Sequence, residues 1–200
     1  MNSMGAHKIG VILAGGRSRR MGTDKAVFVY KGRRLIDHVH ARLKPQVDEI
    51  MISGRLDYGL GLAVISDKDD VPHGPVGGIV SLALTLRETH PQASVFYTVP
   101  VDAPMFPDDI VAALSIGVAS DRPDYTAIAR SASGLQAVFA CWQISAVLAA
   151  AKTLNHADSI SEKSISLQKF AALCGANIVD FDSDVAFLNI NEPRDAVHDS

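Results

Sequence analysis

The chain alternates short apolar runs with longer segments in which apolar residues recur every three or four positions. The short runs predict buried strands, and the longer spacing predicts helices with one apolar face, as where Leu35, Val39 and Leu43 align. This alternation predicts an α/β fold: a three-layer α/β/α sandwich around a mainly parallel, Rossmann-like sheet. In the front part we expect strands at Ile9–Leu13, Glu49–Ser53, Ala63–Ile65 and Val95–Val99, and helices at Leu35–Lys44, Val76–Glu88 and Asp108–Gly117.

The second part of the chain is less regular. Two β-type runs, Tyr125–Ala129 and Gln136–Cys141, flank a turn and are expected to pair across it. An apolar run at Ala26–Tyr30, followed by a Lys-Gly turn, predicts a small ribbon. The remaining expected elements are helices at Ile144–Asn155 and Leu167–Leu173, short strands at Val179–Phe181 and Phe187–Ile190, and a last helix from Pro193.

Composition narrows the class of protein. The 200 residues suit one domain with a sizeable core, and an apolar fraction of 48% argues against disorder. A net charge of −3 argues against nucleic acid as a partner. No apolar run is long enough for a membrane span, and the first residues lack the apolar core of a signal peptide, so a cytoplasmic location is expected. The two cysteines, Cys141 and Cys174, are expected to be small buried residues.

A glycine-rich, cationic segment follows the first expected strand. The run Leu13-Ala14-Gly15-Gly16-Arg17-Ser18-Arg19-Arg20-Met21-Gly22-Thr23-Asp24-Lys25 combines three glycines with four cationic side chains. Such a loop brings backbone N–H groups and positive charge close to a polyphosphate. The spacing fits neither a Walker loop nor a dinucleotide fingerprint.

The same run resembles the signature of the nucleotidyltransferases, L-A-G-G-x-[SG]-x-R-M-G-x-[DN]-K. With Asp24 before Lys25, it is most similar to the molybdenum cofactor guanylyltransferases of the MobA type. The resemblance implies a fold like that of the nucleotide-diphospho-sugar transferases. No linker divides the chain, so we expect a single domain over residues 1–200, with a nucleotide half at roughly 8–117 and an acceptor half at roughly 118–200.

A second motif places an aspartate between two prolines, in Pro100-Val101-Asp102-Ala103-Pro104. The residue before a proline is biased towards extended geometry, so Asp102 is expected at the carboxyl end of a strand, where open α/β sheets bind ligands. Its carboxylate suits Mg²⁺, which takes one or two carboxylates together with substrate phosphates. The alternative is a turn-forming or helix-capping aspartate. The resemblance implies that Asp102 holds the magnesium ion.

A third motif, Gly74-Pro75-Val76-Gly77-Gly78, opens an expected helix. Proline in the first turn and nearby glycines leave an accessible helix N-terminus that suits an anion or a polar base edge. The alternative is ordinary loop-to-helix punctuation. The resemblance implies that Gly74, Gly77 and Gly78 lie against the nucleotide and that Asp67 helps to hold the guanosine. Ser53 stands where the family often has asparagine, which weakens a base contact there.

Residues near the end of the chain are candidates for binding the acceptor substrate. In Asn189-Ile190-Asn191-Glu192-Pro193, two amides alternate along an expected strand and would project to one face. The resemblance implies that Asn189 and Asn191 face a pterin acceptor, although Asn191 is equally a candidate helix cap. Lys163 is either an acceptor contact or a solvated lysine.

The resemblance implies Mg²⁺-dependent transfer of GMP from GTP to molybdenum-molybdopterin, with release of pyrophosphate. Leu13, Ala14, Gly15 and Gly16 would line the nucleotide, while Arg20 and Lys25 would stabilise the leaving pyrophosphate. Other proteins of molybdenum cofactor biosynthesis and the recipient molybdoenzymes are implied partners. The alternatives are a cytidylyltransferase or a sugar-phosphate nucleotidyltransferase on the same scaffold, or a non-catalytic nucleotide-binding module.

Overall fold

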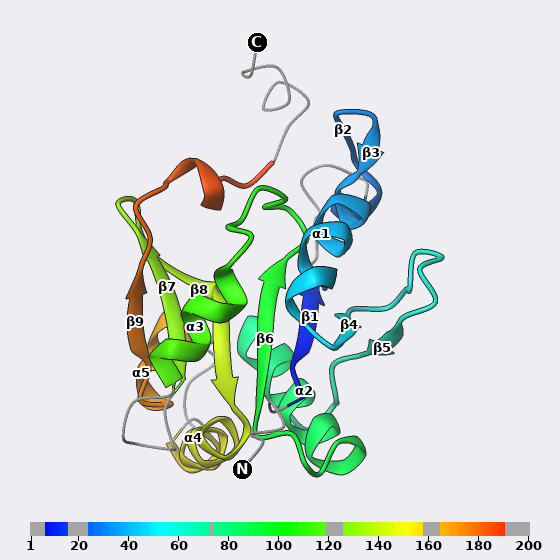
Figure 1. Cartoon of the computed structure of the whole chain (residues 1–200). Helices are drawn as coiled ribbons and strands as arrows, with labels where there is room; N and C mark the ends of the chain where they lie inside the picture. Colours follow the sequence, from blue (N-terminus) through cyan, green and yellow to red (C-terminus); the bar gives the residue numbers. More distant parts are fainter. Residues whose placement is uncertain (1–6, 16–23, 73, 119–125, 158–164, 191–200) are drawn as a thin grey trace, which may run out of the picture.

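A seven-stranded sheet forms the middle layer of the computed structural model, which describes residues 7–15, 24–72, 74–118, 126–157 and 165–190 (Figure 1). The strand order is β5-β4-β1-β6-β8-β7-β9. Pairing is parallel except where β8 lies antiparallel to β6 and β7, so the sheet is mainly parallel, as expected. The strands are β1 (Ile9–Leu13), β4 (Glu49–Ser53), β5 (Ala63–Ile65), β6 (Val95–Pro100), β7 (Ala127–Ser131), β8 (Gly134–Gln143) and β9 (Asn177–Asp180).

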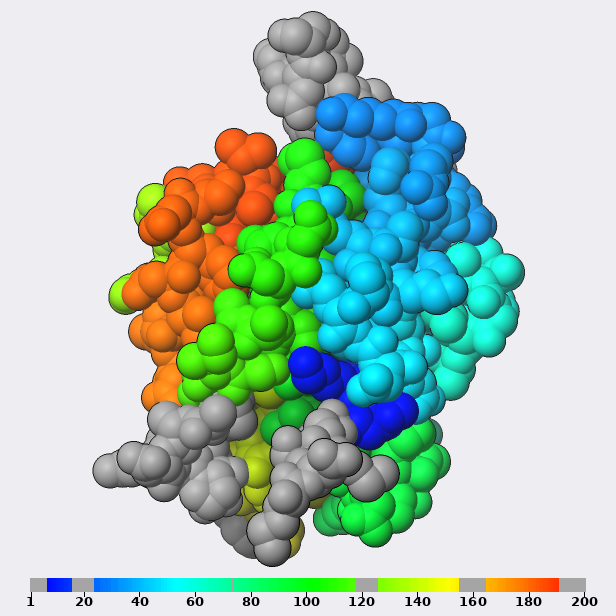
Figure 2. Space-filling model, viewed as in Figure 1, coloured from blue at the N-terminus to red at the C-terminus, as the bar shows by residue number. Residues whose placement is uncertain are grey.

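Helices cover both faces of the sheet and complete the three layers. Alternate strand residues point to opposite faces, so Val11 enters one core cluster and its neighbour Ile12 the other. The first cluster packs against α2 (Pro75–Thr89), α4 (Ile144–Ala157) and α5 (Leu167–Leu173). The second packs against α1 (Leu35–Leu43) and α3 (Ile110–Val118), which form the face seen in Figure 2. Among the described residues, no helix has both the length and the apolar character that crossing a bilayer requires.

A two-stranded ribbon stands above the carboxyl ends of the parallel strands, beside the start of α1 (Figure 1). The segment begins with a 3₁₀ turn, η1 (Lys25–Val27), and continues as β2 (Val29–Tyr30) and β3 (Arg33–Arg34). Lys31 and Gly32 connect the two strands with φ values of 45° and 78°. Positive φ at both central residues is the geometry of a tight hairpin turn, and it confirms the ribbon expected from the sequence.

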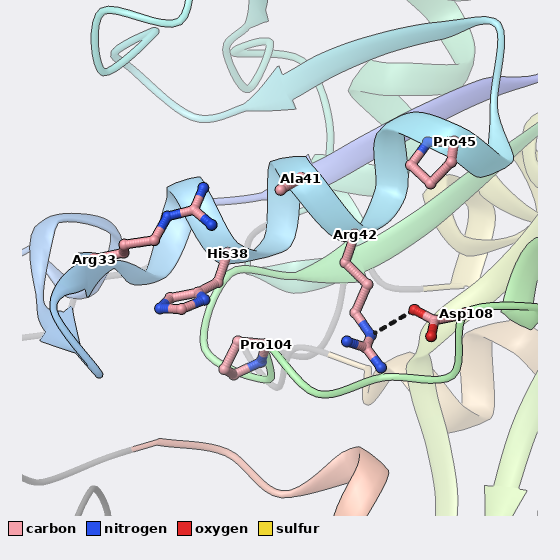
Figure 3. A pocket seen from close by; sticks show the side chains of 7 residues that line it. All are labelled: Arg33, His38, Ala41, Arg42, Pro45, Pro104 and Asp108. Atoms are coloured by element: carbon pink, nitrogen blue, oxygen red, sulfur yellow. Dashed lines mark ion pairs between the residues drawn. The ribbon is translucent and has the colours of Figure 1, made fainter.

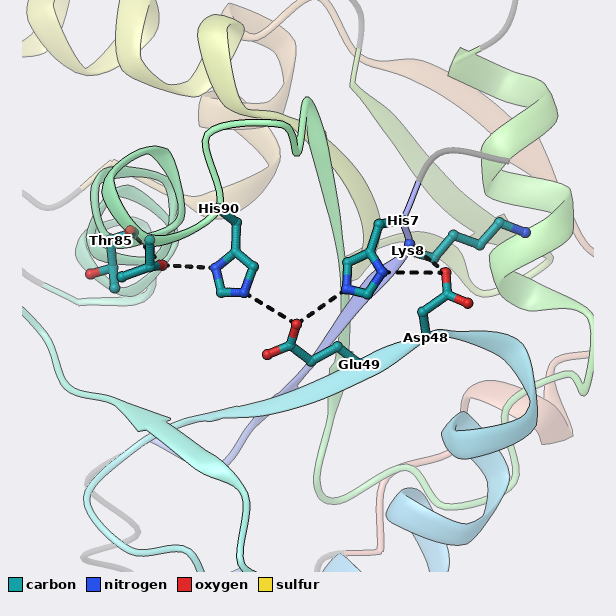
Figure 4. A network of polar contacts seen from close by, with 7 residues as sticks. His7, Lys8, Asp48, Glu49, Thr85 and His90 are labelled. Atoms are coloured by element: carbon teal, nitrogen blue, oxygen red, sulfur yellow. Dashed lines mark hydrogen bonds and ion pairs between the residues drawn. The ribbon is translucent and has the colours of Figure 1, made fainter. Parts of the chain in front are cut away.

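A network of polar side chains lies at the amino ends of β1 and β4 (Figure 4). Glu49 Oε2 lies 3.2 Å from His7 Nε2 and 3.1 Å from His90 Nε2. The backbone N–H of Lys8 donates to the Asp48 carboxylate at 2.8 Å. These contacts connect the segment before β1, the start of β4 and the end of α2, at the amino ends of these two strands.

Both cysteines are free and buried, as the sequence indicates. Burial raises the pKa of the Cys141 and Cys174 thiols to about 12, so both remain protonated near neutral pH. They therefore act as small apolar packing residues in the described structure.

One expected strand is wrong. Residues 187–190 do not pair with the sheet; the chain forms a 3₁₀ turn, η3 (Val185–Phe187), and then continues without regular structure. Phe187 is anchored by edge-on contacts with Phe139 and Phe181, at centroid distances of 5.0 and 5.3 Å. Beyond it, the N–H of Ile190 donates to the carbonyl oxygen of Asp102 at 2.7 Å. Aromatic packing and a loop contact thus replace the sheet pairing that the apolar pattern favoured.

Candidate active site

The register of the two central strands places Ala14 and Gly15, the described residues just after β1, at the same end of the sheet as Asp102. Strands β1 and β6 are parallel neighbours, with Leu13 opposite Pro100. The ladder continues one step further, because the Val101 N–H donates to the Leu13 carbonyl at 3.1 Å. Residues that follow both strands therefore emerge together at the carboxyl edge of the sheet, where ligands bind in open α/β folds.

At this edge Lys25 and Asp102 form an ion pair. Lys25 Nζ donates to Asp102 Oδ2 at 2.7 Å, although the residues are 77 positions apart in the chain. The side chains are 25% and 18% exposed, respectively, so the pair is shielded but open to a ligand. This charge-assisted hydrogen bond therefore places one positive and one negative group side by side at the site.

Asp24 and Tyr58 support the segment that carries Lys25. Asp24 caps η1, since its Oδ1 accepts the Ala26 N–H at 3.0 Å, and its Oδ2 accepts the Tyr58 hydroxyl at 2.8 Å. Tyr58 has a φ of 55°, and its carbonyl accepts a bond from Arg34 Nη1 at 2.9 Å. Burial and the Asp24 contact raise the pKa of the Tyr58 hydroxyl, so it remains a hydrogen-bond donor. Sequence reasoning missed Tyr58, which lies in a loop without a motif.

Arg34 is itself held in place by Asp37. Its guanidinium donates two bonds to the Asp37 carboxylate, at 2.8 and 2.7 Å. This pairing holds the pKa of Asp37 below its usual value, chiefly through the side-chain hydrogen bond. The fork fixes the guanidinium plane, so the bond from Arg34 to Tyr58 has a defined direction.

A second cluster lies where the ends of β1 and β4 meet the start of α2. Ser53 is buried, and its carbonyl accepts the Ala14 N–H at 2.9 Å. A Cβ atom placed on Gly78 would lie 3.4 Å from Asp67 Oδ1 and 3.8 Å from Ser53 Oγ. One placed on Gly15 would lie 3.6 Å from the Ser53 carbonyl oxygen. The structure thus brings together residues from four separate segments that the sequence analysis connected with the nucleotide.

Glycine is required on steric grounds at the start of α2. The N-cap residue Gly74 has a φ of 84°, and a Cβ on Gly77 would lie 1.9 Å from the Pro72 carbonyl oxygen. That contact leaves no room for a side chain unless the backbone before α2 moves. The glycines therefore let the loop carrying Asp67 pack directly against the helix.

Replacing Gly77 with alanine is expected to destabilise the protein by about 1–3 kcal/mol, the usual cost of overpacking. Urea unfolding measures this loss. Gly78→Ala is the matched control: it has space for a Cβ and gains up to about 1 kcal/mol of helix preference. A Gly77→Ala protein as stable as the wild type would contradict the observed packing.

Comparison with known proteins agrees with this arrangement. A family model described as MobA-like NTP transferase domain matches residues 10–168. A molybdenum cofactor guanylyltransferase from Cereibacter sphaeroides is 35% identical over 191 residues, which cover 93% of this chain and 92% of that protein. The chain belongs to the MobA-like NTP transferase family. It is a nucleotidyltransferase, and the resemblance recognised in the segment from Leu13 to Lys25 is confirmed.

Solved structures support the fold of this family member. Molybdopterin-guanine dinucleotide biosynthesis protein A from Archaeoglobus fulgidus matches with a TM-score of 0.68 at 18% identity, covering 94% of this chain and 95% of that one. A 2-C-methyl-D-erythritol 4-phosphate cytidylyltransferase from Thermus thermophilus matches at 0.62 and 12% identity, covering 94% of both chains. The expected fold class is confirmed, and the second match indicates that the fold by itself leaves the base open.

The remaining site predictions for this MobA-like transferase are only partly placed. Leu13 and Ala14 are half-buried beside the exposed Gly15, at the end of β1. Asn189 is exposed, but it does not lie in a strand, so the argument from strand alternation does not apply to it. Four further predicted residues lie outside the described residues: Gly16, Arg20, Lys163 and Asn191.

A cavity of about 310 Å³ lies between α1 and the loop that follows Asp102 (Figure 3). Its polar groups are already engaged: Arg42 pairs with Asp108 at 3.2 Å and donates to the Phe106 carbonyl, and Arg33 Nη2 donates to the Asp37 carbonyl at 3.3 Å. His38 Nε2 lies 2.8 Å from the Tyr30 carbonyl oxygen. The lining contains none of the nucleotide-binding residues expected from the sequence, so the candidate active site remains at the Lys25–Asp102 pair.

Proposed function

We propose that this family member transfers GMP from GTP to molybdopterin carrying molybdenum, and releases pyrophosphate. The proposal rests chiefly on the Lys25–Asp102 pair at the carboxyl ends of β1 and β6. A terminal phosphate oxygen of the acceptor attacks the α-phosphorus of GTP, and the bond from the α-phosphorus to the bridging oxygen breaks. The pyrophosphate leaves with that electron pair, so the reaction needs no protein nucleophile.

The chain's own part in this reaction is positioning and charge neutralisation. Lys25 is a compact ammonium that suits the phosphates of the leaving group, with Arg20 as its proposed companion. The backbone of Gly15 and Gly16 lies next to the phosphates in this proposal. The 3.6 Å approach of a Gly15 Cβ to the Ser53 carbonyl oxygen reflects how closely the described part of this segment packs against β4.

Asp102 is the proposed ligand for Mg²⁺. Its hard carboxylate oxygen fits an ion that takes one or two protein carboxylates and completes its shell with phosphates and water. In the described part of the chain, no group of three or more His, Cys, Asp or Glu residues is arranged to hold a metal ion. A single carboxylate, that of Asp102, fits an ion whose other ligands are mainly substrate phosphates and water. When bound, the metal supplies charge stabilisation at the phosphate oxygens.

Asp67, Ser53 and Gly78 form the proposed guanosine contact. A carboxylate accepts two parallel hydrogen bonds, and Asp67 is exposed at the mouth of this cluster. In this proposal, Gly74 and Gly77 allow the nucleotide to approach the N-terminus of α2 closely. Asn189, Asn191 and Lys163 are proposed acceptor contacts, and Asn189 is exposed on the segment adjoining Asp102.

A nucleotide panel tests this function. With Mg²⁺ and loaded acceptor, GTP is expected to yield a guanine dinucleotide product by mass determination and one pyrophosphate per product. In thermal shift, a nucleotide at about 100 times its Kd stabilises by about 2.7 kcal/mol, or roughly 5–10 °C for a chain of this size. We expect that shift with GTP and a much smaller one with CTP at equal concentration.

Two outcomes would overturn the assignment. A larger shift and a cytidine product with CTP would make the protein a cytidylyltransferase. Binding of GTP without pyrophosphate release, in the presence of loaded acceptor, would indicate a nucleotide-binding module.

A further inference from the structure

The segment after η3, residues 188–190, crosses from the β9 side of the sheet towards the β2–β3 ribbon (Figure 1); we call it the strap. Its upstream end is fixed, because Phe187 is buried and packs on Phe139 and Phe181. Leu188 is 53% exposed, whereas Ile190 is 4% exposed. The strap therefore turns one side chain inward at its far end.

Ile190 makes two different contacts at that end. Its N–H donates to the Asp102 carbonyl oxygen at 2.7 Å, so it binds the backbone of the residue whose carboxylate meets Lys25. Its side chain packs with Tyr30 and Leu35 in a small apolar cluster, with Phe28 alongside. One residue thus bridges the Asp102 loop and the segment that follows Lys25.

Tyr30 provides a second link between the same two parts. Its ring is buried in the cluster with Ile190, and its hydroxyl lies 3.7 Å from the Met105 sulfur, three residues after Asp102. The ribbon, the Asp102 loop and the strap therefore contact one another in pairs. This cluster is separate from the two main cores, so its packing acts locally on the site.

We propose that Ile190 is a positioning residue that holds the Asp102 loop against the Lys25 segment and so sets the metal affinity of the nucleotide complex. The inference rests on the proposed function, in which Asp102 is the metal ligand. On its N-terminal side Asp102 follows β6, which ends at Pro100. On its C-terminal side its carbonyl oxygen accepts the hydrogen bond from the Ile190 N–H of the strap. Loosening that contact widens the range of positions of the carboxylate, which weakens a ligand without removing it.

The test measures Mn²⁺ binding to the protein–GTP complex by electron paramagnetic resonance, with GTP affinity in the absence of metal measured separately. Ile190→Ala is expected to weaken Mn²⁺ binding about tenfold, equal to ~1.4 kcal/mol. GTP affinity without metal should stay within about twofold, because the proposed guanosine cluster lies at the end of β4 and the start of α2, whereas Ile190 contacts the Asp102 loop and the ribbon. Amide exchange should rise in peptides covering residues 101–106. Leu188→Ala is the matched control, since it removes an exposed apolar side chain of the same strap, and should match the wild type.

Two results would overturn the inference: Ile190→Ala binding Mn²⁺ as Leu188→Ala does, or losing metal and nucleotide to the same extent. If Ile190→Ala does not fold, Ile190→Val decides, with about threefold weaker Mn²⁺ binding expected and an unchanged value counting against the proposal. Asp102→Ala in the same assay separates the two ideas. Unchanged Mn²⁺ binding in Asp102→Ala would refute the metal assignment itself, whereas loss there with no effect at Ile190 would refute only the positioning role.

Discussion

Asp102→Ala is expected to lower turnover with Mg²⁺ by at least about 10³-fold, since a catalytic metal supplies several kcal/mol of charge stabilisation. The protein should remain folded. Asp102 contacts Lys25 at a partly exposed site, and losing one such partner costs about 1–3 kcal/mol. Pyrophosphate release measured over a range of Mg²⁺ concentrations, together with urea unfolding, checks both statements.

Asp108→Ala is the matched control for this prediction. Asp108 lies on the same loop, its side chain is 80% exposed, and it pairs with Arg42 at 3.2 Å. Its removal should leave turnover near that of the wild type. Near-normal turnover in Asp102→Ala would exclude Asp102 as the metal ligand and remove the main support for the proposed mechanism.

Lys25→Ala is expected to lower turnover by about 10²-fold or more, because a positive charge near the leaving pyrophosphate stabilises the transition state. The loss should be seen mainly in kcat, measured with GTP and loaded acceptor. A second effect has the opposite sign. Lys25 Nζ contacts Asp102 Oδ2 at 2.7 Å, so the alanine variant without nucleotide should bind Mn²⁺ more tightly than the wild type.

Lys44→Ala serves as the control for Lys25, because Lys44 is exposed at the end of α1, away from the pair. Lys25→Arg tests the geometry, since a planar guanidinium does not replace a compact ammonium at a crowded phosphate site. If Lys25→Ala changed only the affinity for the acceptor, Lys25 would be misplaced in the mechanism.

Hydrophobic spacing predicted the central elements closely. The strands β1, β4 and β5 and the helix α5 have the bounds expected from the sequence. The paired strands β7 and β8 and the ribbon are also confirmed, since each combines a short apolar run with a turn signal. These features depend on local spacing and on turn residues, which a single sequence displays directly.

Spacing failed where distant contacts decide the conformation. The run from Phe187 to Ile190 looks like a strand, but Phe187 packs against two other phenylalanines and Ile190 reaches the Asp102 loop and the ribbon. Apolar residues in such a segment are buried individually, without forming a ladder. No local pattern separates these two ways of burying an apolar side chain.

The sequence by itself determined the family and the chemical groups that are available: a glycine-rich cationic segment after the first strand, and a carboxylate between prolines after another. Only the tertiary structure decided which groups meet, because β1 and β6 are neighbours in one register and so bring Lys25 to within 2.7 Å of Asp102. The same holds for the support of Asp24 by Tyr58 and for the bond from Ile190 to Asp102. Hydrophobic periodicity reports on the conformation of a few neighbouring residues. A contact between residues 77 positions apart depends on strand order and packing, which local spacing does not encode.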